Sequence, residues 1–417
     1  MPTRTRYKVL ALAVLLAGIT YLDRVCISMT APGMMRDLHL DRIQMGFVFS
    51  AFTLAYGLFE IPTGWWGDRV GTRRVLARIV TWWSVFTMLT GAALGYGSLL
   101  AIRFLFGVGE AGAWPNVART FSRWFPMEER GTAQGIFFMG AHLAGGLTPL
   151  LITALLVHFD WRWLFVLIGS VGFVWAIGWF RWFRDEPEQH PTVNREELAH
   201  IEAGRAPAQS HQFSRAQWRQ LFSSRSVYGL CGMYLTQTYG FYFYITWLPS
   251  YLRAARGFSS YTLAILAGLP LTVSVIADLI GGLTTDRLTR RAGIWIGRVA
   301  VGGGSLAVAG VFMIAGTAAP NGIAAAMLIS IAGAFSNFLL GSAWATCSDI
   351  AGNHAGVLSA TMNTAGQVGG FLSPIVAAFL LQKWGSWSIP LYVTGGLYLA
   401  GAACWLLVDP RRPVFDV

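Results

Sequence analysis

Four ionisable residues interrupt long apolar stretches in the N-terminal part of the chain: Asp23 with Arg24, and Arg103 with Glu110. Charged side chains at membrane depth are costly, so each is a functional candidate by default. Arg103 and Glu110 are seven residues apart, which is two helical turns and places them on one face. Two oppositely charged pairs on two helices predict a charge-compensated network that lines a cavity. The alternative is a static ion network with a structural role.

The elements that carry these charges are predicted to be transmembrane helices. Of the 417 residues, 54% are hydrophobic and 12% are charged, which excludes an ordinary soluble enzyme and a disordered protein. About 20 apolar residues are needed to cross a bilayer as a helix. On that rule the apolar runs predict twelve spans. Their ranges are 8–30, 44–65, 75–95, 98–122, 131–157, 162–182, 226–252, 261–284, 294–316, 321–346, 355–382 and 387–408.

The predicted fold is therefore an all-α integral membrane protein with two pseudo-symmetric halves of six helices. We expect an N-terminal bundle at 1–183, a polar cytoplasmic loop at 184–224 and a C-terminal bundle at 225–417. With both termini in the cytoplasm, 23 of the 31 basic residues fall on cytoplasmic segments and six on outer ones. That asymmetry fixes the orientation. The net charge of +11 is thus mostly a topology signal and does not indicate nucleic-acid binding.

A loop signature occurs twice. Gly64 is followed by Asp68-Arg69 and then by Arg73-Arg74. Gly282 is followed in the same way by Asp286-Arg287 and then by Arg290-Arg291. The two aspartates are 218 residues apart, which indicates an internal duplication of the kind common in secondary transporters.

The first copy of this signature resembles the loop between helices two and three of the major facilitator superfamily, and the resemblance covers essentially the whole chain. Three further segments, 21–24, 103–112 and 239–249, resemble the anion:cation symporter branch, which includes bacterial sugar-acid permeases. Within that branch these segments resemble those of the proton-coupled galactonate transporters.

The resemblance implies a role for each matching residue. Arg24 would bind the substrate carboxylate, as suits a guanidinium. Asp23 and Glu110 would carry the coupling proton, and Arg103 would tune Glu110. Substrate hydroxyls would face Tyr21, Tyr56, Gln237 and Asn363, with Trp344 as a further cavity residue. The conformational gate would comprise Gly64, Asp68, Arg69, Arg73, Arg74, Asp286 and Arg287.

The resulting hypothesis is uptake of a small organic anion by proton symport with alternating access across a bacterial inner membrane. A sugar acid such as an aldonate or hexuronate is the first candidate. Uptake of an aromatic or dicarboxylic acid and efflux by antiport are the alternatives. Gly341-Ser342-Ala343 is poorer in hydroxyls than the sugar-acid pattern, which weighs against a highly hydroxylated substrate. Glu60, His142 and Asp278 are candidates for the proton path. The alternatives are a gate or helix-end role for Glu60 and Asp278, and a polar residue satisfied between helices for His142.

No enzyme motif, phosphate loop or Cys/His metal spacing is present in the sequence, so we expect neither catalysis nor a cofactor other than protons. The expected partners are the anion and the lipid bilayer, with no nucleic acid, and we expect a monomer.

Overall fold

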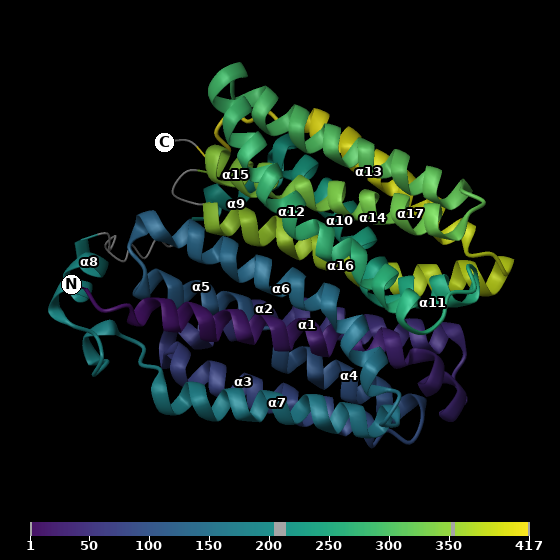
Figure 1. Ribbon diagram of the computed structural model, residues 1–417. Helices are drawn as coiled ribbons and strands as arrows, with labels where there is room; N and C mark the ends of the chain where they lie inside the picture. The colour runs from purple at the N-terminus through teal and green to yellow at the C-terminus, as the bar shows by residue number, and fades with distance from the viewer. Residues whose placement is uncertain (1, 204–213, 352–354, 416–417) are drawn as a thin grey trace. The chain divides into compact units, whose positions relative to one another are not determined.

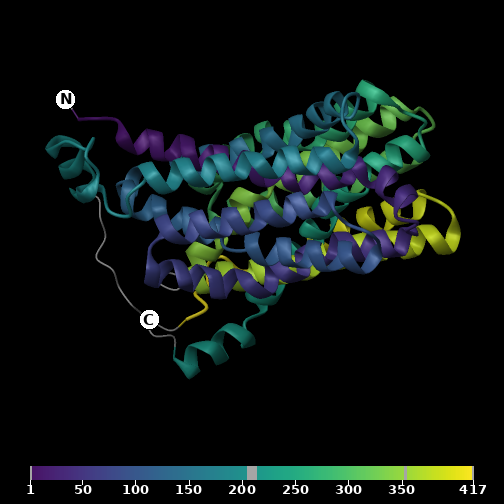
Figure 2. The ribbon, with the colours of Figure 1, turned by 90° about the horizontal axis from the view of Figure 1, so that it is seen from below.

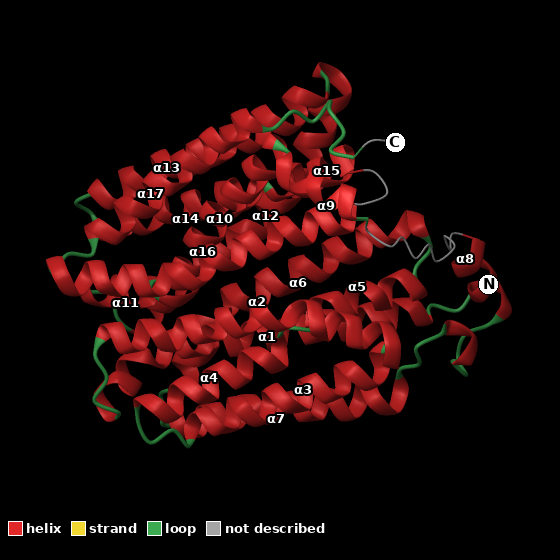
Figure 3. Cartoon of the chain, turned by 180° about the vertical axis from the view of Figure 1, so that it is seen from behind, coloured by secondary structure: helices red, strands yellow, loops and turns green. Residues whose placement is uncertain are grey.

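The computed structural model describes residues 2–203, 214–351 and 355–415. Helices and loops make up these ranges, and Figure 3 shows no strand among them. The all-α prediction is confirmed. Nine helical segments in the described part of the chain are long and apolar enough to cross a membrane, judged by length and composition.

Each of the twelve predicted spans coincides with a helix or a pair of consecutive helices. The first six correspond to α1 (Thr5–Asp37), α2 (Arg42–Val70), α3 (Thr72–Gly91), α4 (Tyr96–Glu110) with α5 (Ala113–Trp124), α6 (Met127–Leu155) and α7 (Trp161–Trp182). The second six correspond to α10 (Arg225–Thr246) with α11 (Leu248–Ala254), α12 (Ser260–Ala292), η2 (Ile296–Ala300) with α13 (Val301–Ala318), α14 (Gly322–Phe338) with α15 (Leu340–Ala351), α16 (Ala355–Trp384), and α17 (Ser388–Cys404) with η4 (Trp405–Leu407).

The polar segment between the two sets of spans contains a 3-10 turn, η1 (Pro187–Gln189), and two short helices. These are α8 (Arg195–Ala203) and α9 (Arg215–Ser223). The chain forms two compact units: unit 1 comprises 1–40 and 51–210, and unit 2 comprises 41–50 and 211–417. Helix α8 therefore belongs to unit 1 and α9 to unit 2.

Within unit 1, α1 packs along α6 and α3 packs along α7 (Figure 1). A close crossing of α2 and α4 depends on Gly107, because a Cβ there would lie 2.5 Å from the Phe52 carbonyl oxygen. The helix that carries Glu110 can therefore approach α2 only because position 107 has no side chain. Within unit 2, α10 packs on α16 and α17, while α13 packs on α14 and α17.

The first copy of the loop signature lies at the junction of α2 and α3. Gly71 has φ +91°, a conformation that favours glycine, and it precedes a helix whose Arg73 amide donates to Asp185 Oδ1 at 2.8 Å. The Arg73 guanidinium donates to the Phe180 carbonyl near the end of α7, at 2.9 and 2.7 Å. Neither this carbonyl contact nor the capping role of Asp185 is among the contacts stated for the sequence above.

The other signature residues are less constrained. Arg69 stacks on Trp65 with 4.0 Å from its guanidinium carbon to the ring centre, and Arg74 and Arg287 are exposed. Asp286 lies 3.7 Å from Arg298, which pairs more closely with Asp349. Gly64 and Asp68 fall within α2, but the environment of each lies outside the described part of the structure. The gate role of these residues stays a prediction.

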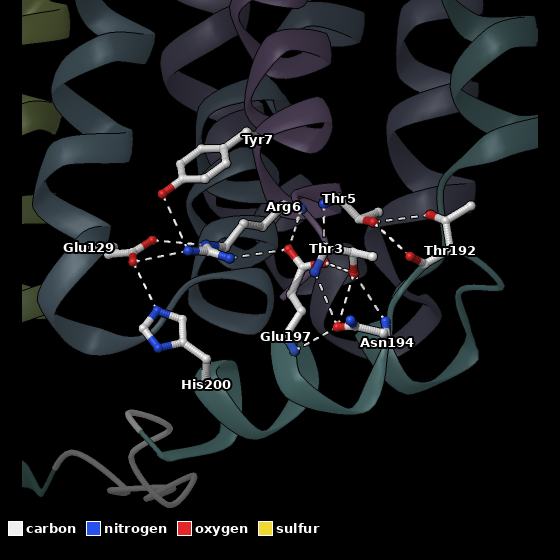
Figure 4. A network of polar contacts seen from close by, with 9 residues as sticks. All are labelled: Thr3, Thr5, Arg6, Tyr7, Glu129, Thr192, Asn194, Glu197 and His200. Carbon is white, nitrogen blue, oxygen red and sulfur yellow. Dashed lines mark hydrogen bonds and ion pairs between the residues drawn. The ribbon is translucent and has the colours of Figure 1, made fainter. Parts of the chain in front are cut away.

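A polar network ties the start of α1 to the start of α6 and to α8 (Figure 4). Its centre is the fully buried Glu197 of α8, which accepts hydrogen bonds from the Thr3 hydroxyl, the backbone amides of Thr5 and Arg6, and the Arg6 guanidinium. The same guanidinium donates to Glu129 of α6, which also contacts His200 at 2.9 Å. Figure 2 shows the start of α1 and the α8 region together at one end of the unit.

Both carboxylates of this network are held ionised. Burial raises the pKa of Glu197, but the hydrogen bonds from Thr3, Arg6 and Thr5 outweigh it and hold the pKa below the ordinary value. Burial likewise raises the pKa of Glu129, and the hydrogen bonds from Arg6 and His200 reverse that effect.

We expect Glu197→Gln to destabilise the protein by about 3 kcal/mol, because the amide nitrogen would face donors and Arg6 would lose a buried partner. The thermal unfolding midpoint of the purified protein should fall by several degrees. Glu196→Gln changes the neighbouring exposed residue of α8 and should leave the midpoint unchanged. Equal midpoints for the two variants would mean that the network adds no stability.

Candidate functional site

The predicted charges of α1 and α4 meet inside unit 1. Arg24 Nε of α1 donates to Oε1 of Glu110 at the end of α4, and the two side chains form a buried ion pair. Glu110 is fully buried and Arg24 is 8% exposed. The hydrogen-bonded partner of Glu110 is therefore Arg24, and the tuning role that the resemblance gives Arg103 stays a prediction.

Asp23 and Arg103 lie in the same buried cluster, close enough for their charges to interact with Glu110. Both side chains are 2% exposed. Within the described part of the chain, Asp23 Oδ1, Arg103 Nε and Glu110 Oε2 have no hydrogen-bond partner. Buried polar atoms are normally satisfied, so this cluster retains unused capacity to take up a proton or a polar ligand.

Four aromatic rings surround the Arg24 guanidinium. Its central carbon lies 5.7 Å from the Tyr21 ring centre, 5.1 Å from Phe52, 5.0 Å from Tyr56 and 5.8 Å from Trp114. Cation–π contacts of this length stabilise a desolvated guanidinium without neutralising its charge. The Arg24 guanidinium therefore lies between these aromatic rings and the Glu110 carboxylate.

Tyr21 and Tyr56 were predicted for this site, whereas Phe52 and Trp114 were not. Helical spacing offered a signal for Phe52, because it precedes Tyr56 by four residues and so shares its face. Trp114 lies beyond the break between α4 and α5 at 111–112, where α-helical spacing from Glu110 no longer applies.

Of the additional proton candidates, His142 of α6 contacts Tyr21, one of the rings around Arg24. Its ring packs edge-on against Tyr21, with 5.9 Å between ring centres, and its side chain is buried. Glu60 of α2 and Asp278 of α12 are half-buried.

Unit 2 contains a buried chain of uncharged polar groups. Gln237 of α10 donates to the Asn337 side-chain oxygen at 3.1 Å, and Asn337 of α14 donates to the Ser274 hydroxyl of α12 at 2.7 Å. Gln237 was predicted as a site residue, whereas Asn337 and Ser274 were not. A buried amide chain on three helices can exchange its internal hydrogen bonds for bonds to a hydroxylated ligand.

The other two candidates, Asn363 and Trp344, also lie in unit 2. Asn363 of α16 is half-buried, and Trp344 of α15 is 39% exposed and packs edge-on against Tyr234 at 6.2 Å. The structure therefore brings together Tyr21, Asp23, Arg24, Tyr56, Arg103 and Glu110 in unit 1, with Gln237 in a separate polar chain of unit 2.

A buried, charge-compensated cluster in a helical membrane protein is a feature found in polytopic transporters. Residues 13–374 match the model of the Major Facilitator Superfamily. The chain belongs to this family, and it is a multi-pass membrane transporter and not an enzyme.

The most similar relatives include several that carry the names of organic-acid transporters. The chain is 35% identical to the probable sulfoacetate transporter SauU of Cupriavidus necator, covering 99% of this chain and 95% of the relative. It is 32% identical to the probable galactarate/D-glucarate transporter GudP of Bacillus subtilis, covering 99% and 94%. It is 28% identical to the D-galactonate transporter of Escherichia coli, covering 99% and 97%.

The fold is also that of solved structures. A bacterial homolog of the human lysosomal transporter Spinster, crystallised inward-facing and unoccupied, superposes with a TM-score of 0.78 at 18% identity, covering 97% of each chain. The predicted major facilitator fold is thus confirmed.

Proposed function

We propose that this protein imports a small organic anion by proton symport with alternating access, and that Arg24 holds the anion. The observation that carries the proposal is the buried Arg24–Glu110 pair within its ring of aromatic side chains. A guanidinium binds a carboxylate or sulfonate well, but Glu110 already occupies that position when it is ionised. A protonated Glu110 releases the guanidinium for the substrate.

Coupling follows from this competition. Burial favours the neutral form of a carboxyl group unless a cation compensates it, and the incoming anion competes for that cation. Substrate and proton therefore assist one another in binding, and loss of the proton restores the Arg24–Glu110 pair and expels the anion. Asp23 serves as the second proton acceptor, and Arg103 balances its charge.

The relatives support the chemical class. Their names specify sulfoacetate, glucarate, galactarate and galactonate, all of which bear an acidic group. We propose a sugar acid as the substrate, with its hydroxyls bound by Tyr21, Tyr56, Gln237 and Asn363 and with Trp344 lining the path. We further propose a bacterial inner-membrane location with both termini cytoplasmic, halves at 1–183 and 225–417 and the loop 184–224 in the cytoplasm.

Thermal stabilisation of the purified protein tests the substrate class. Aldonates, hexuronates, aldarates, sulfoacetate and aromatic acids are added separately, with the uncharged sugar alcohol of matching carbon number as the control. We expect at least one anion to raise the unfolding midpoint, by the equivalent of about 3 kcal/mol at 100-fold excess over its Kd, and the alcohol to have no effect. The proposal would be contradicted if the alcohol raised the unfolding midpoint, or if no anion did.

A further inference from the structure

A cavity of about 750 Å³ lies in unit 2, at the end of the bundle where α10 and η2 begin and η4 ends. It is bounded by the end of α9, the first residues of α10, Trp295 and the segment 406–414. This cavity shares no residue with the Gln237–Asn337 chain. We propose that it binds the headgroup phosphate of an anionic phospholipid.

The walls of the cavity are held by specific contacts. The Asp409 amide donates to the Ser226 hydroxyl at 3.0 Å, and the Val414 amide donates to the Ile350 carbonyl at 2.7 Å. The Tyr228 hydroxyl donates to the Phe222 carbonyl at 2.8 Å, which connects α10 to α9. The C-terminal segment and α9 are thereby fixed against the start of α10, and the cavity is a built feature of the unit.

The lining of the cavity is cationic. Arg225, Arg411 and Arg412 all contribute to it, and Arg412 pairs with Asp409 at 3.2 Å. Asp409 offsets one of these three positive charges. The charges of the exposed Arg225 and Arg411 therefore remain in excess. The hydroxyl of Ser224 adds a neutral donor, whereas that of Ser223 already donates to the Arg219 carbonyl at 2.8 Å. Arginine and hydroxyl donors around one pocket suit a phosphate.

The rim of the cavity distinguishes a lipid from a free anion. Leu406 is 74% exposed, and Leu407 and Trp295 on the same cavity are also exposed. On α9, Trp218 and Phe222 expose two stacked rings, 5.7 Å apart. Aromatic and aliphatic side chains at the ends of membrane-spanning helices lie at the level of the lipid headgroups. A phospholipid whose phosphate is bound by the arginines would have its acyl chains beside this apolar rim, as in basic sites for anionic lipids.

Native mass spectrometry of the delipidated, detergent-solubilised full-length protein tests this site. Dioleoylphosphatidylglycerol and dioleoylphosphatidylcholine are titrated separately, and inorganic phosphate is added as a competitor. We expect the anionic lipid to bind more tightly, with Arg225→Gln/Arg411→Gln weakening it about tenfold or more and leaving phosphatidylcholine binding unchanged. Arg225→Lys/Arg411→Lys should retain most of the preference.

The matched control is Arg290→Gln/Arg291→Gln, which removes the same charge from two exposed arginines at the end of α12 in the same unit. It should keep the wild-type preference. Equal weakening in both double variants would show a diffuse surface charge effect and overturn the site. Displacement of the lipid by equimolar inorganic phosphate would show that the cavity binds free anions and overturn the assignment to lipid.

Discussion

Glu110→Gln should abolish accumulation of the substrate driven by a pH gradient while leaving substrate exchange intact. The amide has the size of a protonated glutamic acid but cannot release a proton, so Arg24 stays available to the anion in both conformations. In proteoliposomes we expect the accumulation ratio to fall to about one, whereas counterflow of labelled substrate continues at a rate within about threefold of wild type.

Glu188→Gln is the matched control, since it makes the same isosteric change at an exposed position of the polar segment. It should accumulate substrate as wild type does. If Glu110→Gln still concentrated substrate against a gradient, Glu110 would not be the coupling acid, and Asp23 would be the next residue to test.

Arg24→Lys should weaken substrate binding by about 100-fold, although it keeps the positive charge. The ammonium group offers no planar pair of donors, and it is more strongly hydrated than the guanidinium that the four aromatic rings now surround. Losses of this size are usual when one partner of a buried charge pair is replaced. Isothermal titration with the anion that best stabilises the protein would measure the change in Kd.

Arg36→Lys provides the control for this variant. It lies on the same helix, α1, but its side chain is 81% exposed and pairs with the neighbouring Asp37 at the helix end. We expect its Kd to equal that of wild type. An Arg24→Lys variant with unchanged affinity would remove Arg24 from the substrate site and leave it a structural counter-ion to Glu110.

The sequence was sufficient to predict the helices and to single out the four charged residues of the N-terminal half as a buried cluster. Apolar runs indicate membrane spans directly, because a helix that crosses the hydrocarbon core exposes mainly apolar side chains to it. Charges inside such runs are conspicuous for the same reason. The pairing of Arg24 with Glu110 was not predictable, because periodicity relates residues on one helix and does not give the register of α1 against α4.

Other features depend on contacts between distant segments. The carboxylate of Asp185 caps α3 although 112 residues separate it from Arg73, and Thr3 meets Asn194 across 191 residues. In the sequence, Asn337 and Ser274 are isolated polar residues of apolar helices. Their contact with Gln237 depends on how α10, α12 and α14 pack together. The close crossing at Gly107 likewise depends on a distant segment, because the atom that a Cβ there would meet is the carbonyl oxygen of Phe52 on α2.

The central claim is that the anion and the proton move together through one site. Wild-type proteoliposomes loaded with a pH-sensitive dye, with no pH gradient imposed, would report both fluxes when labelled substrate is added outside. We predict that the lumen acidifies as substrate enters, that the acidification is dissipated by a protonophore, and that Glu110→Gln shows exchange without acidification. Substrate entry into wild-type vesicles with no change in lumenal pH would contradict proton symport.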